Sequence, residues 1–257
     1  MKNLLFIGDV VGESGCKFLR SKLRNIKQDY KIDITVVNGE NSAQGNGITP
    51  NSADSLINAG ADIITTGNHV FRRKEIFPVL ESSDYIIRPA NYPDGRAYGK
   101  GLCVLDMGCY SVAVVNLMGT AFMEPLDNPF SVIDKILKEI DTPNIFVDFH
   151  GEATSEKKAM GHYLTGKVTG VFGTHTHVQT ADEAILSSHT AYITDVGMTG
   201  SENSCLGVDS KLVIDKFRFH MPVRFKEADS PCFLCGIVVS FDEKSGVAKS
   251  IERIIIR

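Results

Sequence analysis

The chain has 257 residues, 43% of them hydrophobic, which suits one large domain with a sizeable core. A formal net charge of −4 disfavours a protein that holds nucleic acid over an extended basic surface, whereas small anionic ligands remain compatible with it. No apolar stretch approaches the roughly 20 residues that span a bilayer, and the first residues, MKNLLFIGDVVG, predict a strand and not a signal peptide, so we expect a cytoplasmic protein without membrane contact.

Strand-like apolar runs and helical patterns alternate along most of the chain. Strands are predicted at residues 3–7, 34–37, 62–65, 101–106, 112–116, 145–149 and 168–172, and helices at residues 15–28, 50–59 and 130–140. Such alternation predicts a largely parallel sheet. Two antiparallel hairpins are expected later, at residues 184–186 with 191–193 and at residues 232–241 with 247–255. The fold class is therefore α/β, and a sandwich is the simplest architecture.

Six cysteines lie in mostly apolar surroundings, which is typical of reduced thiols that pack as small apolar side chains. Cys232 and Cys235 have C-x-x-C spacing, but no second pair completes a zinc site. The flanking FLCGIVVSF predicts a buried strand, so we assign these two residues to the core.

Polar side chains that can bind metal ions follow five of the predicted strands. In open α/β sheets, groups at the carboxyl ends of parallel strands converge on one crevice, where ligands bind. The candidates are Asp9; Glu40 and Asn41; Asn68 and His69; His150; and His175 and His177. In an extended segment, the intervening Thr176 would let His175 and His177 point the same way.

This set contains two carboxylates, two carboxamides and four imidazoles, with no thiolate. Such oxygen and nitrogen donors suit manganese, iron or zinc. Eight donors exceed the needs of one ion that keeps a position open for water, and they match two ions that share a bridging carboxylate. Glu40 is the expected bridge.

Each residue also has a structural explanation when it is taken alone. Asp9 can cap a helix, Asn41 and Asn68 can occupy turns, and His150 can be a hydrogen-bonded core residue. The coincidence at five strand ends favours a metal site over these explanations. A dinucleotide-binding loop is a weaker interpretation, because GDVVGESG has G-x-x-x-G-x-x-G spacing in place of G-x-G-x-x-G.

Several longer blocks carry a family resemblance. FIGDVVG, VNGENSAQGNGIT, TTGNHVF, RPANYP, DFHGEATSEK, GTHTHVQTAD and TDVGMTG resemble the YmdB-type branch of the calcineurin-like metallophosphoesterase superfamily, from residue 4 to about residue 200 and more loosely beyond. The usual D-x-H of the superfamily is Asp9-Val10-Val11 here, and its bridging Asp is Glu40, followed by Asn41. Both differences are typical of this branch.

The resemblance implies a four-layer α/β/β/α sandwich of mixed sheets, which we expect to be a single domain over residues 1–257. It also implies two metal ions per chain, usually iron or alternatively manganese, with zinc compatible. We hypothesise that Asp9, Glu40, Asn41 and His177 hold the first ion, and that Glu40, Asn68, His150 and His175 hold the second. The implied substrate is a small phosphodiester such as a 2′,3′-cyclic nucleotide, attacked by a hydroxide between the ions.

His69 is the candidate general acid for the leaving oxygen, and its alternative role is to orient a metal ligand. Thr120 stands where the branch often has Arg, so one contact to the phosphate is expected to be missing. Tyr92 is a candidate to stack on a base, with a plain surface turn as the alternative. Substrate-binding residues stay unassigned.

A cytoplasmic dimetal phosphodiesterase is the leading prediction. A phosphomonoesterase or nuclease with the same metals is the alternative among enzymes. A metal-dependent regulatory protein with incidental turnover is the alternative from another class. The oligomeric state stays open, a homo-oligomer included.

Overall fold

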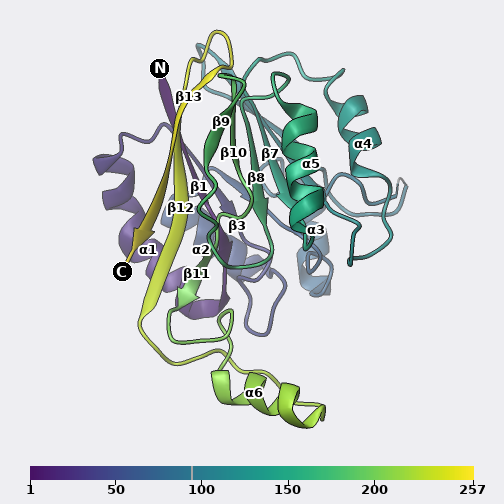
Figure 1. The fold of residues 1–257 in the computed structure, drawn as a ribbon, viewed down its shortest axis with the longest axis vertical. Coiled ribbons are helices and arrows are strands. Elements are labelled where there is room, and N and C mark those ends of the chain that lie inside the picture. Colours follow the sequence, from purple (N-terminus) through teal and green to yellow (C-terminus); the bar gives the residue numbers. More distant parts are fainter. Residues whose placement is uncertain (94) are drawn as a thin grey trace.

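The computed structural model describes residues 1–93 and 95–257. Two mixed sheets pack face to face, with α1 on one side of the pair and α4 and α5 on the other (Figure 1). This arrangement confirms the predicted α/β/β/α sandwich.

The first sheet has the order β2-β11-β12-β1-β3-β4, and β13 pairs with β12. Its strands β1, β3 and β4 are parallel, whereas β12 runs antiparallel to β1 and β13. The bounds are β1 (Lys2–Ile7), β2 (Asp9–Val10), β3 (Ile34–Asn38), β4 (Ile63–Thr65), β11 (Met198–Ser201), β12 (Cys232–Phe241) and β13 (Ala248–Ile256).

The second sheet has the order β5-β6-β7-β8-β10-β9, with β6, β7, β8 and β10 parallel. The antiparallel β9–β10 and β12–β13 pairs confirm both predicted hairpins. The bounds are β5 (Leu102–Asp106), β6 (Ser111–Met118), β7 (Ile145–His150), β8 (Gly170–Thr174), β9 (Ala184–Leu186) and β10 (Thr190–Ile193).

The helices are α1 (Gly12–Asp29), α2 (Pro50–Ala59), α3 (Phe77–Ser82), α4 (Pro129–Ile136), α5 (Thr154–Leu164) and α6 (Ser210–Phe219), with a 3₁₀ turn at Lys74–Ile76. The predicted bounds of α2 are correct, because Thr49 and Ser52 form a capping box at its start and Gly60 ends it at a φ of 115°. The helix predicted over residues 130–140 ends earlier, at Ile136.

Three apolar cores separate the four layers, and the alternation of side chains along each strand builds them. In β1, Leu5 and Ile7 face the helices, while Leu4 and Phe6 face the second sheet. In β7, Phe146 joins the core between the sheets and Val147 joins the core beneath α5. Burial on both faces explains why these strands are almost continuously apolar.

α6 projects beyond the sheets (Figure 1). The structure describes all of its residues, and none of them is buried. The sequence pattern did not predict α3, α6 or the short strands β2 and β11, and for α5 it offered only a possible helix start near Thr154. No helix within residues 1–93 and 95–257 combines the length and apolar character that crossing a membrane requires.

Candidate active site

The carboxyl ends of β3, β4, β7 and β8 bring the predicted site residues together where the two sheets meet. Gly67 makes this approach possible, since a Cβ at that position would lie 2.2 Å from Glu40 Oε2 and 2.4 Å from His150 Nε2. Sequence reasoning therefore identified residues that the fold places side by side.

Glu40 is fully buried and its two carboxylate oxygens face different partners. Oε1 accepts a hydrogen bond from Asn41 Nδ2 at 3.0 Å and lies 3.3 Å from His69 Nδ1. Oε2 lies 3.2 Å from His150 Nε2 and accepts the His69 backbone N–H, also at 3.2 Å. The two oxygens of Glu40 therefore face two different sets of side chains.

Around Oε1, the first predicted group of ligands is close together. His177 Nε2 lies 3.7 Å from Asp9 Oδ1 and 3.2 Å from Asn41 Nδ2. Asn41 directs its amide nitrogen toward Glu40 and His177 and its oxygen toward His69 Nδ1, at 3.0 Å. The Asn41 oxygen can face Glu40 and His177 only after the side-chain amide turns by about 180°.

Around Oε2, the predicted ligands of the second ion lie closer together than those of the first. His150 Nε2 lies 3.0 Å from Asn68 Oδ1 and 3.1 Å from His175 Nδ1. One ligand atom each from Glu40, His150 and His175 lie within 4.8 Å of one another, which makes these three residues a possible metal site. The outer nitrogen of His175, Nε2, lies 3.1 Å from Glu152 Oε2.

The segment that carries His175 and His177 is not extended, so that detail of the prediction was wrong. Both residues lie in a bend after β8, with positive φ angles of 100° and 64°. Left-handed backbone at non-glycine residues costs free energy, of order 1–3 kcal/mol each, and marks a constrained segment. The constraint turns His175 toward His150 and His177 toward Asp9, so each histidine joins a different group.

The proton positions on His150 follow from its neighbours. His150 Nδ1 lies 2.9 Å from Thr174 Oγ1, and that hydroxyl donates to Asp148 Oδ1 at 2.7 Å. A hydroxyl has one proton, so Thr174 must accept from His150, which places a proton on Nδ1. Nε2 then faces the oxygens of Glu40 and Asn68 and lies next to Nδ1 of His175, so a proton or a metal ion is favourable at this point.

The pKa shifts of the buried acids and histidines show that positive charge is favoured beside Asp9 and Glu40. Burial alone would raise the pKa of Asp9 and Glu40, but the histidines beside them hold both below the usual range. Burial would lower the pKa of His150, yet Glu40 outweighs it and raises that pKa to about 9. Asp9 likewise raises the pKa of His177 against burial, whereas burial and the charge of His150 lower that of His175.

These residues fit divalent cations. Asp9 Oδ1 is buried and has no hydrogen bond within the described part of the chain, since its ion-pair partner, His177 Nε2, lies 3.7 Å away, and a buried carboxylate oxygen without a hydrogen bond is costly. The donors are oxygen and imidazole nitrogen atoms, which suit iron, manganese and zinc. Cations would satisfy both Asp9 Oδ1 and the acceptors around His150 Nε2.

Sequence reasoning missed a buried ion pair that holds the histidine segment. Lys157 Nζ in α5 lies 2.7 Å from Asp195 Oδ2, and both side chains are almost completely buried. The same oxygen accepts from the backbone N–H and the hydroxyl of Thr176, at 3.0 and 2.6 Å. Asp195 follows β10, so it is a further strand-end residue, and its motif TDVGMTG was the available signal.

A cavity of about 1260 Å³ opens beside the site. Its lining includes Glu40, Asn41, His69, His175 and His177, and it also includes the segments 206–208 and 224–227. Among the described residues, the lining begins at Val11, so it does not include Asp9. It includes neither Tyr92 nor Thr120.

Tyr92 and Thr120 instead contact other side chains of the protein. The ring of Tyr92 packs edge-on against Phe71, with 5.0 Å between centroids. Thr120 donates its N–H and hydroxyl to Glu156 Oε1, at 3.0 and 3.2 Å.

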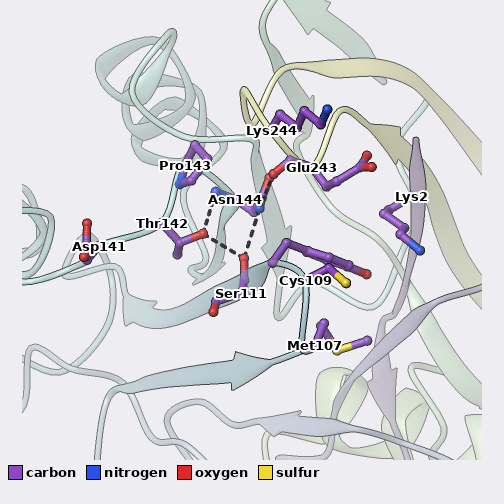
Figure 2. A pocket seen from close by; sticks show the side chains of 11 residues that line it. Lys2, Met107, Cys109, Ser111, Asp141, Thr142, Pro143, Asn144, Glu243 and Lys244 are labelled. Carbon is purple, nitrogen blue, oxygen red and sulfur yellow. Dashed lines mark hydrogen bonds between the residues drawn. The ribbon is translucent and has the colours of Figure 1, made fainter.

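A second hollow of about 680 Å³ lies at the other end of the strands, where β1 and β6 begin (Figure 2). Its polar groups largely bond one another: Thr142 Oγ1 and Asn144 Nδ2 both donate to the carbonyl of Ser111, at 2.7 and 3.0 Å. It contains none of the predicted site residues.

Comparison with known proteins agrees with this architecture. The model of a family described as YmdB-like protein matches residues 5–254. The chain is 47% identical over 255 residues to a Bacillus subtilis (strain 168) protein named 2′,3′-cyclic-nucleotide 2′-phosphodiesterase, covering 98% of this chain and 96% of that one.

Two crystal structures are also similar. A structure described as a novel phosphatase from Mycoplasma pneumoniae has a TM-score of 0.94 at 33% identity, covering 99% of this chain and 93% of that one. A hypothetical protein from Thermus thermophilus has a TM-score of 0.93 at 39% identity, covering 98% of each chain. With a family model that matches nearly its whole length and a relative of such identity, this chain belongs to the YmdB-like protein family.

Proposed function

We propose that the chain is a metal-dependent phosphodiesterase of small phosphodiesters and that 2′,3′-cyclic nucleotides are its substrates. The name of the Bacillus subtilis relative supports this substrate class. The observation that carries the proposal is the position of Glu40, whose two oxygens face two separate groups of oxygen and nitrogen donors. The Mycoplasma structure is described as a phosphatase, so phosphomonoester hydrolysis is the second candidate.

In this proposal, Asp9, Glu40, Asn41 and His177 hold one ion, and Glu40, Asn68, His150 and His175 hold the other. Iron and manganese are the proposed metals. Two such ions supply a nucleophile at neutral pH and neutralise charge on the phosphoryl oxygens. Thr174 and Asp148 keep the Nε2 lone pair of His150 directed at the site.

His69 is the proposed proton donor. Its side chain lines the cavity and is 19% exposed, and Nδ1 lies 3.3 Å from Glu40 Oε1. Nε2 is then the ring nitrogen that can release a proton. As an oxygen from water bonds to phosphorus and the bond from phosphorus to O2′ breaks, His69 protonates O2′, and the product keeps its phosphate on O3′.

The experiment compares wild type with Glu40→Gln, both purified without oxygen. Bound metal per chain is measured, and turnover is measured on a 2′,3′-cyclic nucleotide, a 3′,5′-cyclic nucleotide, a linear diester and a monoester. We expect wild type to prefer the 2′,3′-cyclic substrate and Glu40→Gln to lose both metal and turnover. Full metal content and full rate in Glu40→Gln would disprove the bridging role.

The choice of substrates separates the candidates. A higher kcat/KM for the monoester than for any diester would identify a phosphomonoesterase. Metal binding without significant turnover of any of the four substrates would favour a regulatory protein.

A further inference from the structure

Two segments that line the cavity, residues 206–208 and 224–227, form a wall in which they bind each other. Asp209 N donates to Lys226 O at 3.0 Å, and Ala228 N donates to Gly207 O at 2.9 Å. Leu206 O, in the same wall, lies 3.3 Å from His177 Nδ1. Residues 226–228 are therefore bonded to residues 207–209, next to the site.

Two cations in this wall have no protein partner. Arg224 and Lys226 both line the cavity, and neither side chain has a hydrogen bond or ion pair with any other residue in the described ranges 1–93 and 95–257. Arg73, which also lines the cavity, differs, because it donates to the carbonyls of Gln44 and Asn46. Unpaired cations in a cavity are available to an anionic ligand.

The acid in the same segment does not neutralise these cations. Glu227 turns its carboxylate toward the first turn of α1, where a Cβ on Gly12 would lie 2.2 Å from Glu227 Oε2. An acid at a helix N-terminus interacts favourably with the helix dipole. Its charge is thus directed at α1.

An aromatic residue, Phe225, lies between the two cations in the sequence. Phe225 lines the cavity and is 41% exposed, and Lys216 Nζ lies 4.8 Å from the centroid of its ring. An exposed aromatic ring can stack on a nucleobase, typically with a gain of about 1–3 kcal/mol. The cavity, at about 1260 Å³, also exceeds the roughly 1,000 Å³ at the upper end of small-molecule sites.

We propose that Arg224 and Lys226 bind a second phosphate, which the substrate carries in addition to the diester that is cleaved, and that Phe225 packs against the nucleobase. This inference rests on the proposed function. The second phosphate is either the 5′-phosphate of a cyclic mononucleotide or the next phosphate of an RNA strand that ends in a 2′,3′-cyclic phosphate. The net charge of −4 favours such a short end over a long RNA track.

The test compares three substrates: adenosine 2′,3′-cyclic phosphate, its 5′-phosphorylated form, and a diadenosine nucleotide with a terminal 2′,3′-cyclic phosphate. Wild type should have a lower KM for the two substrates with a second phosphate. In Arg224→Ala/Lys226→Ala, that KM should rise on the order of tenfold, the scale of a lost charge-assisted hydrogen bond, with kcat changed far less. Of these two substrates, the one whose KM is lower in wild type identifies the source of the second phosphate.

Lys244→Ala/Lys249→Ala is the matched control, because it removes two exposed cations in the β12–β13 turn and at the start of β13. It should not change the preference among substrates. Equal KM values of wild type for all three substrates would overturn the inference. The inference would also fail if KM rose by the same factor for all three substrates in Arg224→Ala/Lys226→Ala. It would fail as well if the control variant changed KM as much as this variant does.

Binding separates failure of this inference from failure of the proposed function. Calorimetry compares adenosine 3′,5′-bisphosphate with adenosine 3′-phosphate and needs no turnover. If wild type hydrolyses none of the substrates but binds the bisphosphate more tightly through Arg224 and Lys226, the phosphate subsite stands and the proposed function fails.

The ring is tested in the same way. Phe225→Leu should raise KM for adenosine 2′,3′-cyclic phosphate but not for ribose 2′,3′-cyclic phosphate, which lacks a base. Phe217→Leu is the control, since Phe217 is 71% exposed in α6 and does not line the cavity. A parallel rise on both substrates would show that Phe225 does not contact the base.

Discussion

Thr174 links the interior of the second sheet to the candidate site through one hydroxyl. It donates to Asp148 and accepts from His150, and Asp148 also accepts from Asn38 Nδ2 at 2.9 Å. All four residues are fully buried. The orientation of His150 is therefore set by residues that a substrate cannot reach, as is typical of the partners of metal-binding histidines.

Thr174→Val should weaken metal binding about 10- to 100-fold, because it leaves His150 Nδ1 and Asp148 Oδ1 without their shared partner. Thr174→Ser keeps the hydroxyl and should stay close to wild type. Competition with a chelator of known affinity measures the effect. Equal affinities in the Val and Ser variants would exclude this role of the hydroxyl.

His69→Ala should retain its metal and lose turnover, by about 10²- to 10⁴-fold, for substrates whose leaving oxygen needs a proton. An ester with a nitrophenol leaving group should be affected far less, because that group leaves without protonation. Rates on the two substrate types and metal content are measured together. Loss of metal from His69→Ala would indicate instead that His69 orients a ligand.

Among the elements, α5 fixes the bend that carries His175 and His177. Its Lys157 reaches Asp195 after β10, and Asp195 holds Thr176 between the two histidines. Asp195 Oδ1 also accepts from Gly197 N, and the Gly197 carbonyl accepts from Asp9 N at 3.0 Å. One buried ion pair thus positions candidate ligands of both groups.

Lys157→Met should lower the free energy of unfolding by about 3–5 kcal/mol, because it leaves the buried carboxylate of Asp195 without its cationic partner. Lys158→Met is the matched control on the same helix. Lys158 pairs with Asp182 but is 50% exposed, so its loss should cost at most about 1 kcal/mol. Denaturant unfolding measures both. Similar losses in the two variants would contradict a special role for the buried pair.

For the molecule as a whole, the site lies where the carboxyl ends of parallel strands from both sheets meet. It concentrates acids and histidines in a buried place, so protons and metal ions compete for it. The stability of the folded protein should therefore depend on both.

Without metal, the free energy of unfolding should fall as pH rises from about 6.5 to about 9. The pKa of His150 is raised from its ordinary value of 6.5 to about 9 in the folded protein, so its contribution is full below 6.5 and lost through 9. The stabilisation by added Mn²⁺ should increase over the same interval, because fewer protons compete. Thermal unfolding with and without Mn²⁺ measures both trends, and a metal effect that shrinks as pH rises would contradict them.

The apolar runs were sufficient to predict most strands and both hairpins, because strands buried on two faces have to be apolar. α6 was not predicted, and because none of its described residues is buried, it lies outside the buried layers that the apolar runs indicate. The bend at His175 was mispredicted as extended, because its conformation depends on Asp195 and Lys157, which are distant in sequence.

The sequence by itself determined the α/β class, and the family resemblance that it carries implied the four-layer sandwich. It also determined the residue types of the candidate site, because polar side chains at the ends of parallel strands converge whatever the details of packing. Tertiary structure alone decided which contacts each oxygen of Glu40 makes, which ring nitrogen of His150 faces Thr174, and that Arg224, Phe225 and Lys226 line the cavity beside the site. These features depend on distances between segments far apart in the chain, and no local pattern encodes them.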